Sequence, residues 1–171
     1  MEPTQKDEHE RPDMTGYVLT VEREIGAGPE AIFAVLSDAS QHALIDGSGM
    51  VQGSAESTPE RLTMGTTFGM GMKMAAVKYS TVNHVVEFEE NRRIAWQTGP
   101  TGRWGRVLAG RIWRYQLEPV DGGTLVRESW DITPDHQRAL LKLGNIYWNK
   151  TRRDMERTLA RLDALVASRH S

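Results

Sequence analysis

The chain of 171 residues contains no cysteine. This absence excludes disulfide bonds, thiolate metal ligands and a cysteine nucleophile. The chain also lacks any run near the roughly 18 uninterrupted apolar residues of a membrane-spanning helix. Its formal net charge of −2 shows no basic excess, which argues against nucleic acid as a partner. We therefore expect a soluble, cytoplasmic protein with no stable membrane insertion.

Several motifs of enzymes and cofactor-binding proteins are missing as well. The five histidines are scattered, and no His-x-x-x-His pair, Walker loop or G-x-S-x-G elbow occurs. Residues 26–31 fit a G-x-G-x-x-A pattern, but strand patterns follow it where a dinucleotide-binding unit needs alternating helices. The sequence therefore predicts no metal and no cofactor.

The first 14 residues are polar and charged, and they lack the apolar core of a signal peptide. They carry too little apolar surface to offset the entropy lost on ordering, so we expect a disordered tail. Residues 15–171 have the length and composition of one globular domain.

Hydrophobic periodicity divides the rest of the chain into strands followed by helix. Alternating apolar residues predict seven strands, at 17–25, 50–56, 66–74, 82–88, 94–98, 111–118 and 124–132. Helical spacing predicts a helix over 29–38, a short one over 40–45, one starting near Pro134, and a long amphipathic one from Trp148 to Val166. Because most strand precedes most helix, the fold class is α+β. We expect one curved antiparallel sheet folded around the last helix, with an apolar pocket between them.

Four segments carry a resemblance to a known superfamily: residues 21–38 (ending in EAIFAVLSD), 92–96 (RRIAW), 123–130 (GTLVRESW) and 154–162 (DMERTLARL). Together they resemble the SRPBCC (START/polyketide cyclase-like) proteins over roughly residues 17–168. The resemblance implies the helix-grip fold, in which a seven-stranded antiparallel sheet grips the C-terminal helix around a hydrophobic cavity. The superfamily includes lipid carriers, hormone receptors and aromatase/cyclases. It has no shared catalytic motif, so the resemblance assigns no catalytic residue.

A methionine-rich face on the third predicted strand is the strongest indication of a ligand. Phe68, Met70, Met72 and Met74 alternate with small or polar residues and therefore share one face. Methionine is flexible and polarizable, which suits a wall that accommodates irregular apolar guests. The same face serves equally well as core filling under the helix, and the sequence leaves both interpretations open.

Polar residues on otherwise apolar faces are candidates for orienting a ligand. His84 lies between Val82 and Val86 in the alternation, which predicts an interior imidazole, either hydrogen-bonded in the core or functional. Glu128 shares a face with Val126 and Trp130, and an interior carboxylate without a partner has a raised pKa.

Arg111 is the expected partner of Glu128. Alternation places Arg111 on one face with Trp113 and Tyr115, and a hairpin joins this strand to the strand of Glu128. The alternative is a bulge that shifts one strand and leaves both charges solvated.

These residues lead to three functional hypotheses. The first is a protein that binds a lipid or polyketide-like molecule in an internal cavity. The second is an aromatase/cyclase with Glu128 or His84 as the base, Arg111 polarising a carbonyl and Tyr115 beside them. The third is an interaction module with a vestigial cavity. The Gly-rich segment 99–110, with Trp104, is a candidate lid. The predicted ligand-binding residues are Phe68, Met70, Met72, Met74, His84, Trp96, Arg111, Trp113, Tyr115, Glu128, Trp130 and Met155.

Overall fold

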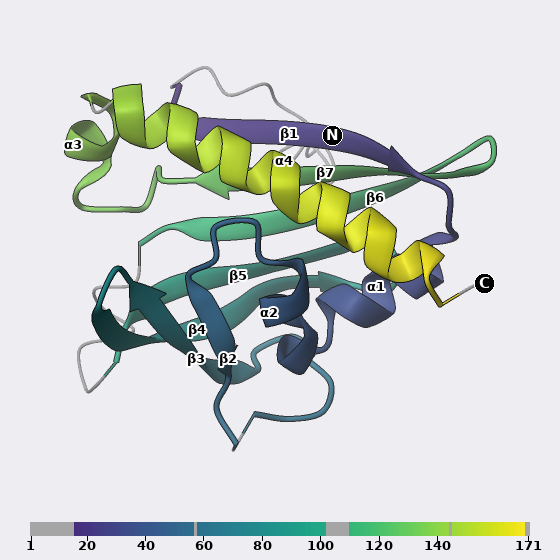
Figure 1. The fold of residues 1–171 in the computed structure, drawn as a ribbon, viewed down its shortest axis with the longest axis horizontal. Helices are drawn as coiled ribbons and strands as arrows, with labels where there is room; N and C mark the ends of the chain where they lie inside the picture. Colours follow the sequence, from purple (N-terminus) through teal and green to yellow (C-terminus); the bar gives the residue numbers. More distant parts are fainter. Residues whose placement is uncertain (1–15, 57, 102–109, 144, 170–171) are drawn as a thin grey trace, which may run out of the picture.

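Seven antiparallel strands form one curved sheet, and a long C-terminal helix lies across it in this computed structural model (Figure 1). The structure describes residues 16–56, 58–101, 110–143 and 145–169. The predicted tail and Trp104 of the candidate lid lie outside these residues. The strands are β1 (Val18–Ile25), β2 (Val51–Ser54), β3 (Thr67–Met74), β4 (Val77–Glu89), β5 (Arg93–Pro100), β6 (Ile112–Val120) and β7 (Gly123–Asp131). The helices are α1 (Pro29–Leu36), the 3₁₀ turn η1 (Ala39–Gln41), α2 (His42–Ile45), α3 (Arg138–Leu143) and α4 (Asn145–Ala167).

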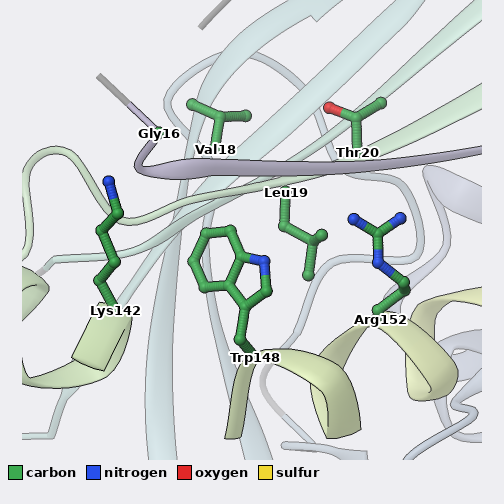
Figure 2. A pocket seen from close by; sticks show the side chains of 7 residues that line it. All are labelled: Gly16, Val18, Leu19, Thr20, Lys142, Trp148 and Arg152. Atoms are coloured by element: carbon green, nitrogen blue, oxygen red, sulfur yellow. The ribbon is translucent and has the colours of Figure 1, made fainter. Parts of the chain in front are cut away.

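The strand order is β1-β7-β6-β5-β4-β3-β2, so the first strand pairs with the last. This pairing makes β1 an edge strand beside α4. Leu19 of β1 and Trp148 of α4 point toward each other across that seam (Figure 2). The predicted α+β helix-grip architecture is confirmed: the sheet has seven strands, and α4 is the longest helix.

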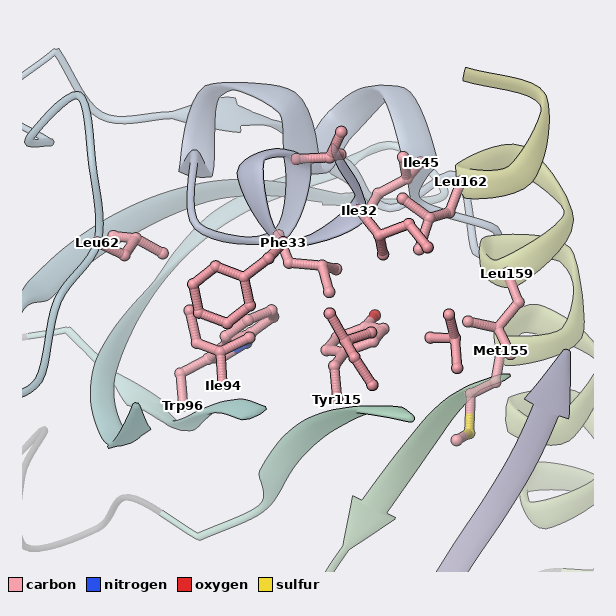
Figure 3. Packing of buried hydrophobic residues seen from close by; sticks show 14 of the residues in the cluster. Ile32, Phe33, Ile45, Leu62, Ile94, Trp96, Tyr115, Met155, Leu159 and Leu162 are labelled. Carbon is pink, nitrogen blue, oxygen red and sulfur yellow. The ribbon is translucent and has the colours of Figure 1, made fainter. Parts of the chain in front are cut away.

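Helix α1 fills one end of the space between the sheet and α4. Pro29 stands at the first helical position, where its missing N–H is not needed. The next residues bury Ile32, Phe33, Val35 and Leu36. Figure 3 shows Ile32 and Phe33 pointing into the same interior as Leu159 of α4. We call this the α1 end of the molecule. The opposite end, with α3, the first turns of α4 and the β3–β4 turn, is the α3 end (Figure 1).

Helix α4 buries one side chain on almost every turn. Met155, Leu159, Leu162 and Val166 are spaced by three or four residues, and all four are buried. Each such side chain contributes about 1.5–3 kcal/mol through burial. This stripe is the one that the sequence pattern predicts.

A glycine fixes the α2–β2 loop onto α4. The amide of Gly47 donates a hydrogen bond to Thr158 Oγ1 at 2.9 Å, and Thr158 Oγ1 donates in turn to the carbonyl of Asp154 at 3.0 Å. A Cβ atom at position 47 would lie 2.0 Å from the Asp154 carbonyl oxygen. Only glycine allows the loop to approach the helix this closely, so the loop covers the middle of the sheet–helix space.

Candidate functional site

Two rows of side chains cross the inner face of the sheet. Strand register places Trp96, Trp113 and Trp130 side by side on β5, β6 and β7. The next row toward the α1 end contains Tyr115 and Glu128 as direct cross-strand partners. Trp113 is half-buried and the other four side chains are buried. An aromatic wall therefore stands beside a buried carboxyl group.

Aromatic side chains from the helices cover this wall. Tyr147 and Trp148 of α4 lie 6.1 and 5.6 Å from Trp130, measured between ring centroids. On the other side of the row, His42 of α2 stacks on Trp96 at 4.8 Å. Burial lowers the pKa of His42, and its Nε2 donates to the carbonyl of Leu36 at 2.9 Å, so the ring is neutral at neutral pH.

Glu128 and Tyr115 form a buried hydrogen-bonded pair. The hydroxyl of Tyr115 donates to Glu128 Oε1 at 2.9 Å, and the residue Glu128 is only 2% exposed. Burial raises the pKa of Glu128 to about 8; the hydrogen bond from Tyr115 opposes this rise, and the nearby Asp46 adds to it. Burial, together with the charge of Glu128, also raises the pKa of Tyr115 well above its usual 10. At neutral pH the carboxyl group is therefore mostly a neutral acid.

Two buried polar atoms on β7 are left without partners. Glu128 Oε2 and Trp130 Nε1 make no hydrogen bond within the part of the chain that the structure describes. Because Oε1 accepts from Tyr115, the acid proton belongs on Oε2, and both atoms are then donors. They lie on the same face of β7, two residues apart. A buried donor without an acceptor costs about 1–3 kcal/mol, so an acceptor oxygen placed here would be stabilising.

Arg111 does not pair with Glu128, so that expectation was wrong. Its Nε lies 3.2 Å from Oδ2 of Asp135, in the segment between β7 and α3. The hairpin register explains the difference, because Glu128 lies directly opposite Tyr115. Arg111 precedes the first residue of β6 and lies four residues, about 13 Å of extended chain, from Tyr115.

The expected interior position of His84 was also wrong. His84 Nδ1 lies 2.9 Å from Thr67 Oγ1 in an exposed contact on the outer face. The buried residues of this stretch are Asn83 and Val85. A β-bulge between Val85 and Glu87 breaks the alternation. Residues 82, 84, 86 and 88, which the alternation assigns to one face, therefore do not share it.

Asn83 and His42 are interior polar groups that the sequence did not identify. Asn83 Oδ1 accepts a hydrogen bond from Thr98 Oγ1 at 2.7 Å, which satisfies it inside the sheet. His42 belongs to no recognisable sequence motif. Its position in the short apolar helix α2 was the only indication that its side chain is buried.

The methionine face is divided by burial. Phe68 and Met70 are buried and Met72 is half-buried, but Met74 is 59% exposed. Met74 was therefore wrongly expected to line an interior site, because the end of β3 extends beyond the elements that cover the sheet. Met155, like the aromatic residues described above, lies in the interior where the pattern placed it.

Two hollows stand out among the described residues, and both lie at the surface. One, of about 350 Å³, runs between β1 and the α3–α4 region (Figure 2). Its lining is Gly16, Val18, Leu19, Thr20, Lys142, Trp148 and Arg152. The other, of about 540 Å³, has a mainly polar lining of Asp38, Ser40, Ser54, Ala55, Glu56, Thr58, Pro59 and Glu60. Neither is an enclosed cavity beneath α4, so the internal cavity stays a prediction. Trp148, however, touches both the first hollow and Trp130.

The described residues contain no group of three acidic, histidine or cysteine side chains placed to hold a metal ion. Among the described helices, none is both long enough and apolar enough to cross a bilayer.

Comparison with known proteins adds a family to this geometry. A family model described as "Polyketide cyclase / dehydrase and lipid transport" matches residues 18–167. The uncharacterised protein Rv0088 of Mycobacterium tuberculosis is 27% identical over 129 residues, which is 75% of this chain and 52% of that protein. The chain thus spans about half the length of the curated relatives it matches.

Solved structures share the fold at low sequence identity. Protein Ms6760 from Mycobacterium smegmatis superposes with a TM-score of 0.69 at 15% identity, covering 94% of this chain and 97% of that one. The Polyketide_cyc-like protein Cgl2372 from Corynebacterium glutamicum gives 0.50 at 21% identity, covering 88% and 85%. At these identities the likeness concerns the fold alone.

Proposed function

Since the chain belongs to the polyketide cyclase/dehydrase and lipid-transport family of the SRPBCC superfamily, we propose that it binds an apolar small molecule between the sheet and α4. The ligand carries an acceptor oxygen, as in a ketone or a phenolate. The aromatic row of Trp96, Trp113 and Trp130 forms the wall for its apolar body. The observation that carries the proposal is the pair of buried donors, Glu128 Oε2 and Trp130 Nε1, for which the described residues supply no acceptor.

A guest needs space that the interior side chains fill in this structure. Trp148 is the natural one to move, because it is half-buried and borders the hollow beside β1. Rotation of its indole away from Trp130 would join that hollow to the aromatic row. The entry route proposed here therefore runs between β1 and α4.

The test uses two ligands of nearly equal shape, 2-acetylnaphthalene and 2-isopropenylnaphthalene, of which only the first carries an acceptor oxygen. Titration calorimetry at pH 6 should show the ketone binding at least about tenfold more tightly, since one matched buried donor contributes on the order of 1.4 kcal/mol or more. Equal affinities, or no binding of either compound, would contradict the proposal.

Variants of Glu128 sharpen the same experiment. Glu128→Met removes one of the two donors and should reduce the preference for the ketone to what Trp130 Nε1 alone supports. Glu128→Gln keeps an N–H donor at every pH, so its preference should persist above pH 8. The preference of the wild type should weaken there, because Glu128 ionises with a pKa of about 8 and no longer donates, while Trp130 Nε1 still does.

A second candidate function is proton transfer in an aldol-type cyclisation. The observation that favours it is a buried carboxylic acid whose pKa lies close to neutral pH. His84 takes no part because it lies on the outer face, and Arg111 is held by Asp135. In this candidate, Glu128→Gln retains binding of an aromatic polyketide but loses turnover. Turnover that survived in this variant would exclude Glu128 as the acid or base.

A further inference from the structure

The α3 end of the molecule exposes a group of large apolar side chains. Leu143 is 82% exposed and Leu140 is 70% exposed, and α3 buries none of its residues. The β3–β4 turn and the start of α4 add further exposed apolar side chains to this group. The apolar residues of this surface are Met74, Val77, Leu140, Leu143 and Tyr147.

These residues come from separate segments that meet at one end. Figure 1 shows α3 and the β3–β4 turn at the same extreme of the long axis. Tyr147 of α4 lies close enough to Tyr79 of β4 to add to the rise in the tyrosine pKa that burial causes. The exposed apolar side chains therefore lie at the same end of the molecule, on the helices on one side and on the β3–β4 hairpin on the other.

Positive charge is concentrated on the same segments. Residues 66–86 and 136–153 contain seven Lys and Arg residues and no Asp or Glu. The whole chain has a net charge of −2, so the remaining residues together carry −9. Lys73, Lys78 and Arg152 form no ion pair with any described residue, whereas Arg114 and Arg127 on the sheet pair with glutamates.

We propose that the α3 end docks onto an anionic lipid bilayer. Exposed leucine and methionine side chains would enter the headgroup region while the surrounding cations contact lipid phosphates. The docking is peripheral, since it uses a short helix and a hairpin turn. This proposal is independent of the interior site.

Charge and shape together favour a membrane over other occupants. A second copy docked face to face would bring one basic surface against another, which is repulsive. A nucleic acid would match the charge but offer no partner for protruding leucines. A bilayer supplies both an anionic surface and an apolar layer beneath it.

The test is vesicle flotation of the full chain. Phosphatidylcholine vesicles with about 40% phosphatidylglycerol should carry the protein upward, pure phosphatidylcholine vesicles should not, and added salt should weaken binding. Leu143→Ser should reduce the partition coefficient on the order of tenfold. Lys73→Gln and Lys78→Gln should each reduce it about fivefold.

The chain offers matched controls. Met74 and Met64 are 59% and 60% exposed, but Met74 ends β3 at the α3 end and Met64 precedes the other end of that strand. Met74→Ser should weaken flotation, while Met64→Ser and the distant Arg92→Gln should not. All these positions are exposed, so unchanged circular dichroism and melting temperature would show that folding is intact.

Three results would overturn the proposal. The first is a wild-type protein that does not float with anionic vesicles. The second is equal loss in the Met64 and Met74 variants. The third is concentration-dependent dimerisation that Leu143→Ser abolishes, without vesicle binding; this would identify a second copy of the chain as the occupant.

Discussion

The two ends of the sheet–helix interface are built differently. At the α1 end, Ile32 and Phe33 meet Leu159 and Leu162 of α4 in an interior of buried aliphatic and aromatic side chains. From the middle of the sheet toward the α3 end, tryptophans replace aliphatic residues, and two buried donors have no acceptor among the described residues. The first arrangement maximises stability. The second forgoes part of it, which is typical of a region that serves a ligand.

The charges of the sheet surface and of the β3–β4 hairpin also differ in how they are compensated. On the sheet surface, Arg114 and Arg127 pair with glutamates. On the β3–β4 hairpin at the α3 end, Lys73 and Lys78 make no ion pair within the described part of the chain and lie beside exposed apolar residues. Substitutions at the α1 end should therefore lower the free energy of unfolding, and substitutions of exposed residues at the α3 end should lower the affinity for anionic vesicles.

The largest expected effect is at the α1 end. Phe33→Ala removes a fully buried ring whose centroid lies 5.3 Å from that of Phe88. The substitution should lower the free energy of unfolding by about 3–5 kcal/mol. Leu143→Ala at the α3 end should change it by less than about 0.5 kcal/mol. Urea unfolding of both variants measures the difference. Similar losses of unfolding free energy in the two variants would contradict the proposed difference between the two ends.

Glu128→Gln should change stability in a way that depends on pH. Glu128 has a folded pKa of about 8, above the value of 4.5 that is usual for a solvated glutamate. The stability from its buried neutral form is therefore complete below pH 4.5 and is lost as the pH rises to 8. Relative to wild type, the glutamine variant should gain roughly 1.4 kcal/mol per pH unit within that window. Unfolding free energies of both proteins at pH 5, 6.5 and 8 measure this gain, and a constant difference would refute it.

Gly47→Ala tests the contact that covers the middle of the interface. The added methyl group would meet the Asp154 carbonyl oxygen at 2.0 Å, so the loop or α4 must shift. We expect a loss of about 2 kcal/mol in unfolding free energy. Gly49→Ala tests the same loop without a steric clash, although its positive φ of 71° adds strain of its own. A Gly47 variant as stable as wild type would show that the loop is not held against the helix.

Tyr115→Phe should have the smallest effect on stability, about 1 kcal/mol, because it removes one hydrogen bond to Glu128. That bond lowers the pKa of Glu128, so the variant should titrate above the wild-type value. Carboxyl-carbon NMR measures the shift. A lower pKa in the variant would mean that the pair is arranged differently.

The sequence predicted the framework well because strands and helices follow local periodicity. The buried stripe of Met155, Leu159 and Leu162 repeats at helical spacing, and the seven alternating segments became seven strands. Glu128 was expected inside because its neighbours on the same face, Val126 and Trp130, are apolar.

The partners of those residues could not be predicted with the same security. The bulge after Val85, which turns His84 outward, has no signal in an otherwise regular alternation. The pairing of Glu128 with Tyr115 depends on the hairpin register, and the exposure of Met74 depends on which elements cover β3. Each of these follows from contacts between distant segments.

Ligand binding as proposed above requires Glu128 to be a buried neutral acid with one oxygen available to the ligand. Its most direct test is a carboxyl-carbon NMR titration of the free protein, with the Glu128 resonance assigned by its loss in Glu128→Gln. We expect a midpoint of about 8, because burial favours the neutral carboxyl group. A midpoint near 4.5, the value of a solvated glutamate, would contradict this expectation.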